Sequence, residues 1–156
     1  MINLSGEVNY EMLNSLLKSY TGAYLHIYFS SPEGGMVDVA EAIIDFINLH
    51  KDNIEITFYG ENFSSGMDIF IKTECKKNIL PDTRGMYHYS WQEVSISQSG
   101  KLTNEYDKFS IQQMKLSKNR TIAFLKTTKF LEKEINAVKK GKDVYFSFDR
   151  MKDIIA

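Results

Sequence analysis

The chain has 156 residues, of which 43% are hydrophobic and 25% are charged, and its formal net charge is −1. This length and composition are typical of one soluble globular domain. No apolar run approaches the ~20 residues that a membrane span needs, and the opening MINLSGEV lacks the basic and apolar regions of a signal peptide. We therefore expect a single domain over residues 1–156 and no membrane partner.

Cysteine and histidine usage limits the chemistry that the chain could support. The single cysteine, Cys75, excludes an intramolecular disulfide, which suits the cytoplasm. The chain has three histidines, His26, His50 and His88. Their spacing, with Cys75, does not match that of a known metal site. We therefore expect no metal and no cofactor.

The net charge hides an asymmetry along the chain. Residues 1–100 carry 6 Lys/Arg and 13 Asp/Glu, a balance of −7, whereas residues 101–156 carry 13 and 7, a balance of +6. A basic region can indicate nucleic acid as a partner. The lysines follow helical patterns without interleaved aromatic residues, which favours a solvated face or a subunit contact. We therefore expect no nucleic-acid partner.

Strand and helix patterns alternate through the first 90 residues. Apolar residues recur at helical spacing, while AYLHIYF is apolar or aromatic on both faces, as in a buried parallel strand. This alternation predicts an α/β layered domain. The expected strands are 2–4, 23–29, 54–59, 78–80 and 85–89, and the expected helices are 9–20, 37–50 and 64–72.

The last third has weaker patterns. Residues 94–96 and the turn 98–100 predict a hairpin, and polar helical sequence follows over about 111–140. Residues 143–148 predict a short final strand, which is followed by a terminal helix.

Three glycine-, serine- or histidine-bearing breaks come directly after predicted strands: SSPEGG, ENFSSG and MYHY. In open α/β sheets, the loops beyond the carboxyl ends of the strands converge on one crevice. We therefore expect these breaks to share one region of the fold.

The residue types in these breaks could support nucleophilic catalysis. A serine needs a base and donors for the oxyanion, and a serine at a helix start lies beside free backbone N–H groups. His88 is a candidate base, Asp143 could orient its ring, and Gly34 and Gly35 could expose amides.

Each of these residues also has a purely structural explanation. Ser64 and Ser65 could cap a helix, the histidine could be a half-buried core residue, the glycine pair could form only a turn, and Asp143 could be a loop acid. The residues alone leave both explanations open.

Five segments, in order, resemble the proteolytic subunit of the Clp protease, a serine peptidase with the crotonase-like fold. INLSGEV resembles I-x-L-x-G-x-V, and LHIYFSSPEGGMVDVAEAIIDFI resembles the family's strand, S-P-G-G turn and helix. YGENFSSGMDIF resembles the nucleophile turn G-x-A-A-S-M-G, LPDTRGMYHY resembles L-P-x-S-R-x-M-x-H-Q, and KDVYFSFDRMKDII resembles D-x-F-L-S-A. The resemblance spans residues 2 to about 154.

The resemblance implies an α/β spiral of ββα units with a strand–helix insertion for oligomer contacts. Such proteins assemble as stacked rings that enclose the active sites, so a homo-oligomeric ring is expected, with residues 91–135 as the insertion. In the family, residues before the first strand form loops that engage a ring-shaped ATPase. This sequence begins at that strand, which makes an ATPase partner doubtful.

The resemblance also implies a Ser-His-Asp triad that hydrolyses peptide bonds in peptides or unfolded segments. Ser64, four residues after Gly60, becomes the nucleophile, His88 the general base and Asp143 the acid that holds its tautomer. The amides of Gly35 and Ser65 become the oxyanion hole. A substrate strand would bind beside Gly34 and Gly35 and near residues 91–96.

The sequence departs from the family's motifs at several positions, which leaves alternatives open. Glu33 is inserted into the S-P-G-G turn, Phe63 replaces a small alanine, and Tyr89-Ser90 replaces Gln-Pro. Counting from Ser65 instead would place Ile69-Phe70-Ile71 over the family's apolar triplet and make Ser65 the nucleophile. A non-catalytic scaffold or partner subunit, or an acyl-CoA enzyme of the crotonase type, are the alternative functions.

Overall fold

The computed structural model describes residues 1–89 and 105–155, with side chains from residue 108 onward in the second range. Contacts between residues divide the chain into two compact units. The first unit comprises Met1–Tyr87 and Asp143–Ala156, and the second comprises His88–Lys142. The single domain expected from the sequence stays a prediction.

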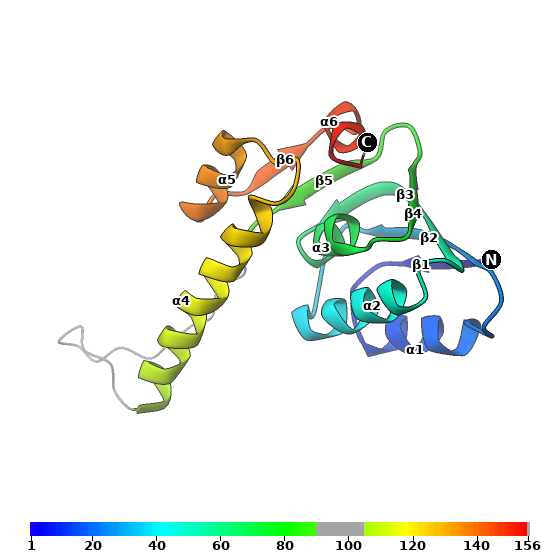
Figure 1. Cartoon of the computed structure of the whole chain (residues 1–156), viewed down its shortest axis with the longest axis horizontal. Helices are drawn as coiled ribbons and strands as arrows, with labels where there is room; N and C mark the ends of the chain where they lie inside the picture. Colours follow the sequence, from blue (N-terminus) through cyan, green and yellow to red (C-terminus); the bar gives the residue numbers. More distant parts are fainter. Residues whose placement is uncertain (90–104, 156) are drawn as a thin grey trace. The chain divides into compact units, whose positions relative to one another are not determined.

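The first unit is built on one six-stranded sheet (Figure 1). The strands follow the order β1-β2-β3-β5-β6, and β4 pairs with β3 beside this path. All pairs are parallel except β5 with β6, which is antiparallel. The strands are β1 (Ile2–Ser5), β2 (Leu25–Ser31), β3 (Ile54–Phe63), β4 (Lys76–Ile79), β5 (Arg84–Tyr87) and β6 (Val144–Phe146).

Strand β3 is four residues longer than the sequence pattern predicts. Gly60 has φ 58°, which glycine adopts readily and which interrupts the alternation of side chains. The register with β2 shifts there, from Phe29 opposite Phe58 to Ser31 opposite Asn62. Such a bulge bends a strand. The first half of β3 pairs with β4, and its last three residues pair with β5.

Helices α1 (Tyr10–Ser19) and α2 (Val37–Leu49) lie side by side along one face of the sheet (Figure 1), and α3 (Ser65–Lys72) packs against α2. The Asn9 side chain caps α1 by accepting the Met12 N–H at 3.1 Å. In the core, the Phe58 ring is edge-on to the rings of Phe29 and Phe70, at 5.5 and 5.0 Å between centroids. Helix α6 (Phe148–Ile155) contacts β5 and β6.

The second unit contains helices α4 (Glu105–Leu125) and α5 (Glu132–Lys139). The sequence predicted helical structure across residues 111–140, whereas the structure is interrupted between α4 and α5. This interruption has a local cause. The hydroxyls of Thr127 and Thr128 donate to the carbonyls of Phe124 and Leu125, at 2.7 and 2.6 Å, so they compete with the helical pattern. The hairpin predicted at residues 94–100 lies outside the described residues.

The predicted α/β layering is confirmed, and every strand and helix expected before residue 90 is present to within a few residues. Across residues 1–89 and 105–155, the structure contains no helix that is both long and apolar enough to cross a membrane.

Candidate active site

Ser64 joins β3 to α3 in a backbone conformation that few side chains adopt. Its φ is 53° and its ψ is −115°, and a positive φ costs an ordinary residue on the order of 1–2 kcal/mol. Its N–H donates to the Met86 carbonyl at 2.8 Å, and its carbonyl accepts the N–H groups of Met67 and Asp68 at 2.9 and 3.0 Å. These bonds to β5 and α3 hold the strained turn in place.

The Ser64 side chain lies against Gly34. A β-carbon at Gly34 would lie 2.9 Å from Ser64 Cβ, 3.4 Å from Ser64 Oγ and 3.0 Å from the Phe63 carbonyl oxygen. Gly34 also has φ 69°. Both the lack of room for a β-carbon and the positive φ therefore require glycine at position 34.

Gly35 is fixed from two sides. On one edge, the Val8 N–H donates to the Gly34 carbonyl at 2.7 Å, and the Met36 N–H donates to the Val8 carbonyl at 2.9 Å. On the other edge, the Ser65 hydroxyl donates to the Gly35 carbonyl at 3.0 Å. The Gly35 carbonyl therefore points to the start of α3.

The start of α3 packs closely on the end of β2. A β-carbon at Gly66 would lie 2.9 Å from Ser31 Cβ and 3.0 Å from the Ser31 carbonyl oxygen. Ser31 is fully buried, and its hydroxyl donates to the Gly34 carbonyl at 3.4 Å. The structure therefore brings Gly34, Ser64 and their neighbours Gly35 and Ser65 together.

The two adjacent serines differ in their surroundings. Ser65 is 1% exposed and donates to the Gly35 carbonyl. Ser64 is half-buried, and its side chain forms no capping hydrogen bond to the described first turn of α3. Of the two hydroxyls, that of Ser65 is buried and that of Ser64 is partly exposed, and which serine is the nucleophile stays a prediction.

His88 and Asp143 adjoin two residues that pair across the sheet of the first unit. Tyr87, the last residue of β5, pairs with Val144, the first residue of β6. His88 follows Tyr87 and is half-buried, whereas Asp143 precedes Val144 and is exposed. His88 belongs to the second unit and Asp143 to the first, so their roles beside Ser64 stay predictions.

The sequence model of the family described as Clp protease matches residues 2–148. The chain belongs to the Clp protease family. Among solved structures, the chain is similar to a mutant of ClpP1 from Listeria monocytogenes, with 25% identity and a TM-score of 0.66; the match covers 98% of this chain and 85% of that one. No curated protein matches the sequence. These matches confirm the predicted family and the Clp/crotonase-like α/β fold, and they support a Clp-like peptidase.

Two departures from the family's motifs lie beside Ser64. The inserted Glu33 is exposed, and the glycine pair that follows it keeps the contacts described above. Phe63 is edge-on to the exposed Tyr145, with 6.3 Å between ring centroids and 89° between planes. Both departures are therefore accommodated around the turn, Glu33 at the surface and Phe63 against Tyr145 of β6.

Sequence reasoning missed Asp68, which falls in the family's apolar triplet when counted from Ser64. Its carboxylate lies 3.4 Å from Lys72 Nζ, which in turn lies 2.5 Å from Glu41 Oε1. Burial raises the pKa of Asp68, and Lys72 offsets part of this shift. Burial lowers the pKa of Lys72, but the two carboxylates hold it above its usual value. Only the i,i+4 spacing of Asp68 and Lys72 was visible in the sequence.

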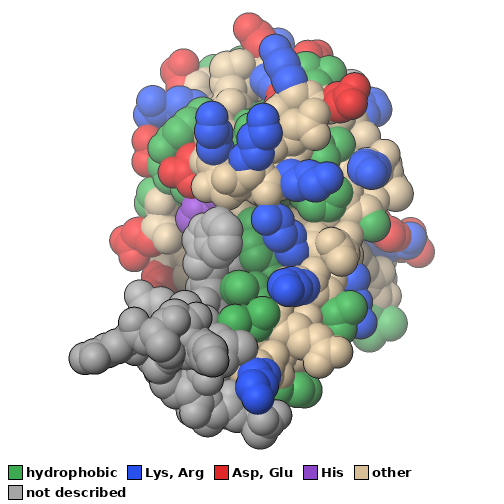
Figure 2. Space-filling model, turned by 90° about the vertical axis from the view of Figure 1, so that its left-hand side faces the viewer, with side chains coloured by type: hydrophobic (Ala, Val, Ile, Leu, Met, Phe, Trp, Pro, Cys, Tyr) green, Lys and Arg blue, Asp and Glu red, His purple; other side chains and the backbone are tan. Residues whose placement is uncertain are grey.

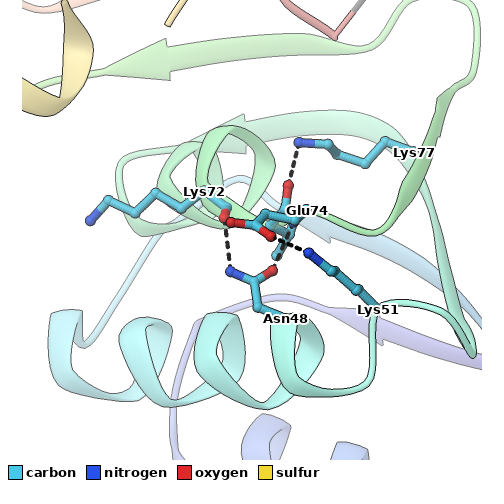
Figure 3. Close-up of polar contacts among 6 residues, drawn as sticks. Asn48, Lys51, Lys72, Glu74 and Lys77 are labelled. Atoms are coloured by element: carbon cyan, nitrogen blue, oxygen red, sulfur yellow. Dashed lines mark hydrogen bonds and ion pairs between the residues drawn. The ribbon is translucent and has the colours of Figure 1, made fainter. Parts of the chain in front are cut away.

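The other end of α3 is tied to α2 and β4 (Figure 3). The Asn48 amide donates to the Lys72 carbonyl at 3.1 Å, and its oxygen accepts the Glu74 N–H at 2.7 Å. Lys51 lies 2.6 Å from Glu74 and lowers the pKa of that carboxyl. The Lys77 ammonium donates to two carbonyls at the end of the helix. Hydrogen bonds to neighbouring elements thus hold both ends of α3, the helix that begins at the Ser64 turn.

A separate cleft opens on the first unit, with a volume of about 510 Å³. The predicted site residues do not line it. Its lining residues are Met1, Ile2, Asn3, Tyr28, Tyr59 and Leu80.

The second unit is strongly basic. Residues 88–142 carry 11 Lys/Arg and 5 Asp/Glu, a balance of +6. Figure 2 shows a face of the molecule on which Lys and Arg side chains gather among hydrophobic ones. On α4 and α5, Lys118, Lys126 and Lys139 line a groove together with the apolar side chains of Ile122 and Ala123. The lysines of the sequence pattern therefore belong to a surface that is partly apolar.

Proposed function

We propose that this chain is a Clp-like serine peptidase that hydrolyses peptide bonds in peptides or unfolded segments, with Ser64 as the nucleophile. The observation that carries the proposal is the strained Ser64 turn between β3 and α3, held over Gly34. A sharp strand-to-helix turn with positive φ is the arrangement by which other serine hydrolases present a nucleophilic hydroxyl. The half-buried Ser64, rather than the buried Ser65, fits this role.

His88 is the general base, and Asp143 holds its imidazole in the required tautomer. The base takes the proton of the Ser64 hydroxyl during attack and later donates it to the leaving amine. Support for this assignment comes from the resemblance of LPDTRGMYHY to the family's histidine motif. The pairing of Tyr87 with Val144, the chain neighbours of the two residues, also supports it.

The amides of Gly35 and Ser65 stabilise the oxyanion that forms on the substrate carbonyl. An N–H at the first position of a helix has no acceptor within the helix, and the helix dipole favours negative charge there. Preorganised donors of this kind contribute typically 10²–10³-fold to the rate. The hydrogen bond from the Ser65 hydroxyl to the Gly35 carbonyl places these two residues next to each other, which supports their pairing.

An extended substrate binds as a strand beside Gly34 and Gly35. Val8 occupies one edge of this segment, so the substrate would use the edge on the Ser64 side. The second predicted wall, residues 91–96, lies outside the described residues. Main-chain hydrogen bonds would give this mode affinity with little dependence on side chains, as suits unfolded segments.

We further propose that residues 1–156 form one Clp protease-like domain that acts in the cytoplasm within a homo-oligomeric ring. The family match supports the ring. The basic, partly apolar surface of α4 and α5 suits the subunit contacts that the insertion would make.

A fluorophosphonate probe tests the nucleophile directly, because it reacts only with an activated serine. The assembled wild-type protein is labelled and hydrolyses a fluorogenic peptide, Ser65→Ala keeps at least part of the labelling, and Ser64→Ala loses it. Labelling that survives Ser64→Ala but not Ser65→Ala moves the nucleophile by one residue. A folded, assembled wild type with neither labelling nor hydrolysis is a non-catalytic scaffold instead, and turnover of an acyl-CoA indicates the crotonase-type alternative.

A further inference from the structure

The hydroxyl of Ser65 binds the residue whose amide is the other proposed oxyanion donor. Ser65 is 1% exposed, and its hydroxyl donates to the Gly35 carbonyl at 3.0 Å. In the motif G-x-A-A-S-M-G, with Ser64 as its serine, this position is methionine, whose side chain has no hydrogen-bond donor. The bond therefore depends on a residue in which this chain differs from the motif.

The segment that contains Gly35 has few restraints of its own. Gly34 has φ 69° and Gly35 has φ 144°, and two successive glycines leave many other backbone conformations open. A β-carbon at Gly35 would collide with the backbone of Val8, so a larger residue cannot restrict the segment at that position. Hydrogen bonds must therefore hold its conformation.

Val8 holds one edge of this segment. Its N–H donates to the Gly34 carbonyl at 2.7 Å, and its carbonyl accepts the Met36 N–H at 2.9 Å. The peptide between Gly34 and Gly35 is planar and trans, so the Gly35 N–H points in the direction opposite to the Gly34 carbonyl. Val8 therefore directs the Gly35 N–H away from itself, but it does not set the distance of that N–H from α3.

The Ser65 hydroxyl holds the other edge. The Gly35 carbonyl that it binds belongs to the same peptide as the Met36 N–H, which Val8 binds. This peptide is therefore held at both ends. Gly35 is exposed, so without the hydroxyl its carbonyl could bind water instead. Loss of the hydroxyl would then cost little stability but would release the segment from α3.

We propose that the Ser65 hydroxyl is a positioning group that holds Gly35 against the start of α3, so that the N–H groups of Gly35 and Ser65 keep the spacing that an oxyanion requires. This inference rests on the proposed function, because its consequence concerns the reaction of Ser64. Ser65 thus has two tasks, since its N–H binds the oxyanion and its hydroxyl fixes the second donor.

Ser65→Ala removes the hydroxyl and keeps both N–H groups. A misplacement of about 1 Å can cost about 10²-fold in rate, and removal of a donor typically costs 10²–10³-fold. Ser65→Ala should therefore lower kcat for a fluorogenic peptide by about ten- to a hundredfold and leave KM unchanged. A peptide aldehyde forms a tetrahedral adduct with serine that resembles the transition state, so its affinity should fall by the same factor.

Thr73→Val is the matched control at the other end of α3. Thr73 is 2% exposed, and its hydroxyl donates to the Ile69 carbonyl at 2.7 Å, so this variant also removes one buried hydroxyl that binds a backbone carbonyl. It should keep the wild-type kcat and aldehyde affinity. Thermal unfolding and native mass verify that both variants are folded and assembled.

The possible failures are distinguishable. A wild-type kcat in Ser65→Ala, an unchanged aldehyde affinity, or an equal loss of kcat in Thr73→Val overturns the positioning role alone. Mass spectrometry of the labelled protein locates the fluorophosphonate. A probe on Ser65, or a wild type that is neither labelled nor active, overturns the proposed function, and the positioning role with it.

Discussion

At the scale of single residues, Ser64 and Gly34 depend on each other. Ser64 keeps its positive φ because backbone bonds to β5 and α3 hold it, and its side chain has room only because Gly34 lacks a β-carbon. The inserted Glu33 does not change this contact, since it lies at the surface. The space at Gly34, rather than the length of the loop, therefore decides whether the turn keeps its shape.

Gly34→Ala tests this dependence. The new β-carbon would lie 2.9 Å from Ser64 Cβ at a position with φ 69°. We expect a loss of unfolding free energy above the ~1–2 kcal/mol that positive φ alone costs, together with loss of fluorophosphonate labelling. Denaturant unfolding and labelling measure the two effects.

Gly22→Ala is the matched control for Gly34→Ala. Gly22 has φ 88° and would have nothing within 4 Å of a β-carbon. It should lose only the ~1–2 kcal/mol of backbone strain and keep full labelling. Equal losses of unfolding free energy in the two variants would contradict a steric role for Gly34.

Asn62 carries an unusual polar atom two residues before Ser64. Its side chain is fully buried and donates to the Tyr59 carbonyl at 3.1 Å, while its Oδ1 has no hydrogen-bond partner among the described residues. Burying an unsatisfied acceptor costs about 1–3 kcal/mol, more than one ordinary hydrogen bond contributes. Asn62→Ala should therefore change the free energy of unfolding by less than about 1 kcal/mol.

Asn48 provides the contrast in the same experiment. It uses both ends of its amide, toward the Lys72 carbonyl and the Glu74 N–H. Asn48→Ala should therefore cost about 1–3 kcal/mol, since it leaves two backbone groups unpaired. A larger loss for Asn62→Ala than for Asn48→Ala, measured by denaturant unfolding, would show that the Asn62 oxygen has a partner.

At the scale of elements, Glu55 on β3 ties together the strands around it. It accepts hydrogen bonds from Tyr24, ahead of β2, at 2.5 Å, and from Asn78 and Lys76 on β4 at 2.5 and 3.1 Å. The Tyr24 hydroxyl, with the two β4 donors, lowers the pKa of Glu55 from 4.5 to about 2. A depressed carboxyl pKa means that the folded state holds the proton less tightly than the unfolded state does.

The stability of the fold should therefore depend on Glu55 in acid. Its contribution is complete above pH 4.5 and is lost as the pH falls from 4.5 toward about 2. In Glu55→Gln, urea unfolding between these pH values should show a shallower loss of stability than in wild type. Glu132→Gln, at an exposed position on α5, is the control and should follow the wild-type curve. Parallel curves for Glu55→Gln and wild type would contradict the shift.

Local patterns predicted most elements but not how they connect. The apolar stripe of α2 and the buried β2 are visible in the sequence because burial repeats with the period of each element. The extension of β3 past Gly60 was not predicted, because glycine at a bulge resembles the end of a strand. The break between α4 and α5 depends on threonine hydroxyls, which local propensity alone does not direct to a particular carbonyl.

The candidate site divides in the same way. Ser64, Ser65, Gly34 and Gly35 could be predicted to lie together, because the loops after parallel strands meet at one edge of a sheet. The ion pair of Glu41 with Lys72, beside Asp68, could not be predicted, because it joins positions that are distant in the chain. Ordered motifs therefore identify candidates for the chemistry, whereas the residues that support them appear only in three dimensions.

At the scale of the whole molecule, the charges are segregated between the two units. The first unit carries 8 Lys/Arg and 15 Asp/Glu, a balance of −7, against +6 for the second. Copies that assemble by placing the basic unit of one against the acidic unit of the next gain attraction that salt screens over about 8–10 Å. Contacts between two second units would instead repel.

Assembly should therefore depend on salt. In sedimentation velocity, the oligomer should shift toward smaller species between 0.05 M and 1 M NaCl, and Lys126→Glu with Lys139→Glu should cause a similar shift at low salt. Leu49→Gln, at an exposed position of the first unit, should leave the sedimentation coefficient unchanged. An oligomer of the same size at both salt concentrations would indicate that apolar contacts dominate the interface.

At Ser64, the residue that the proposed reaction requires differs from the residue that would make the fold most stable. Glycine is the residue that adopts this positive-φ backbone conformation most readily. The free energy of unfolding of Ser64→Gly should therefore be about 1 kcal/mol higher than that of Ser64→Ala, although both variants lack the hydroxyl. Selection for stability alone would favour glycine at this turn. A copy of this chain released from the need to react with substrate would therefore be expected to drift toward glycine at position 64, and the serine in the present sequence is consistent with continued selection for its hydroxyl.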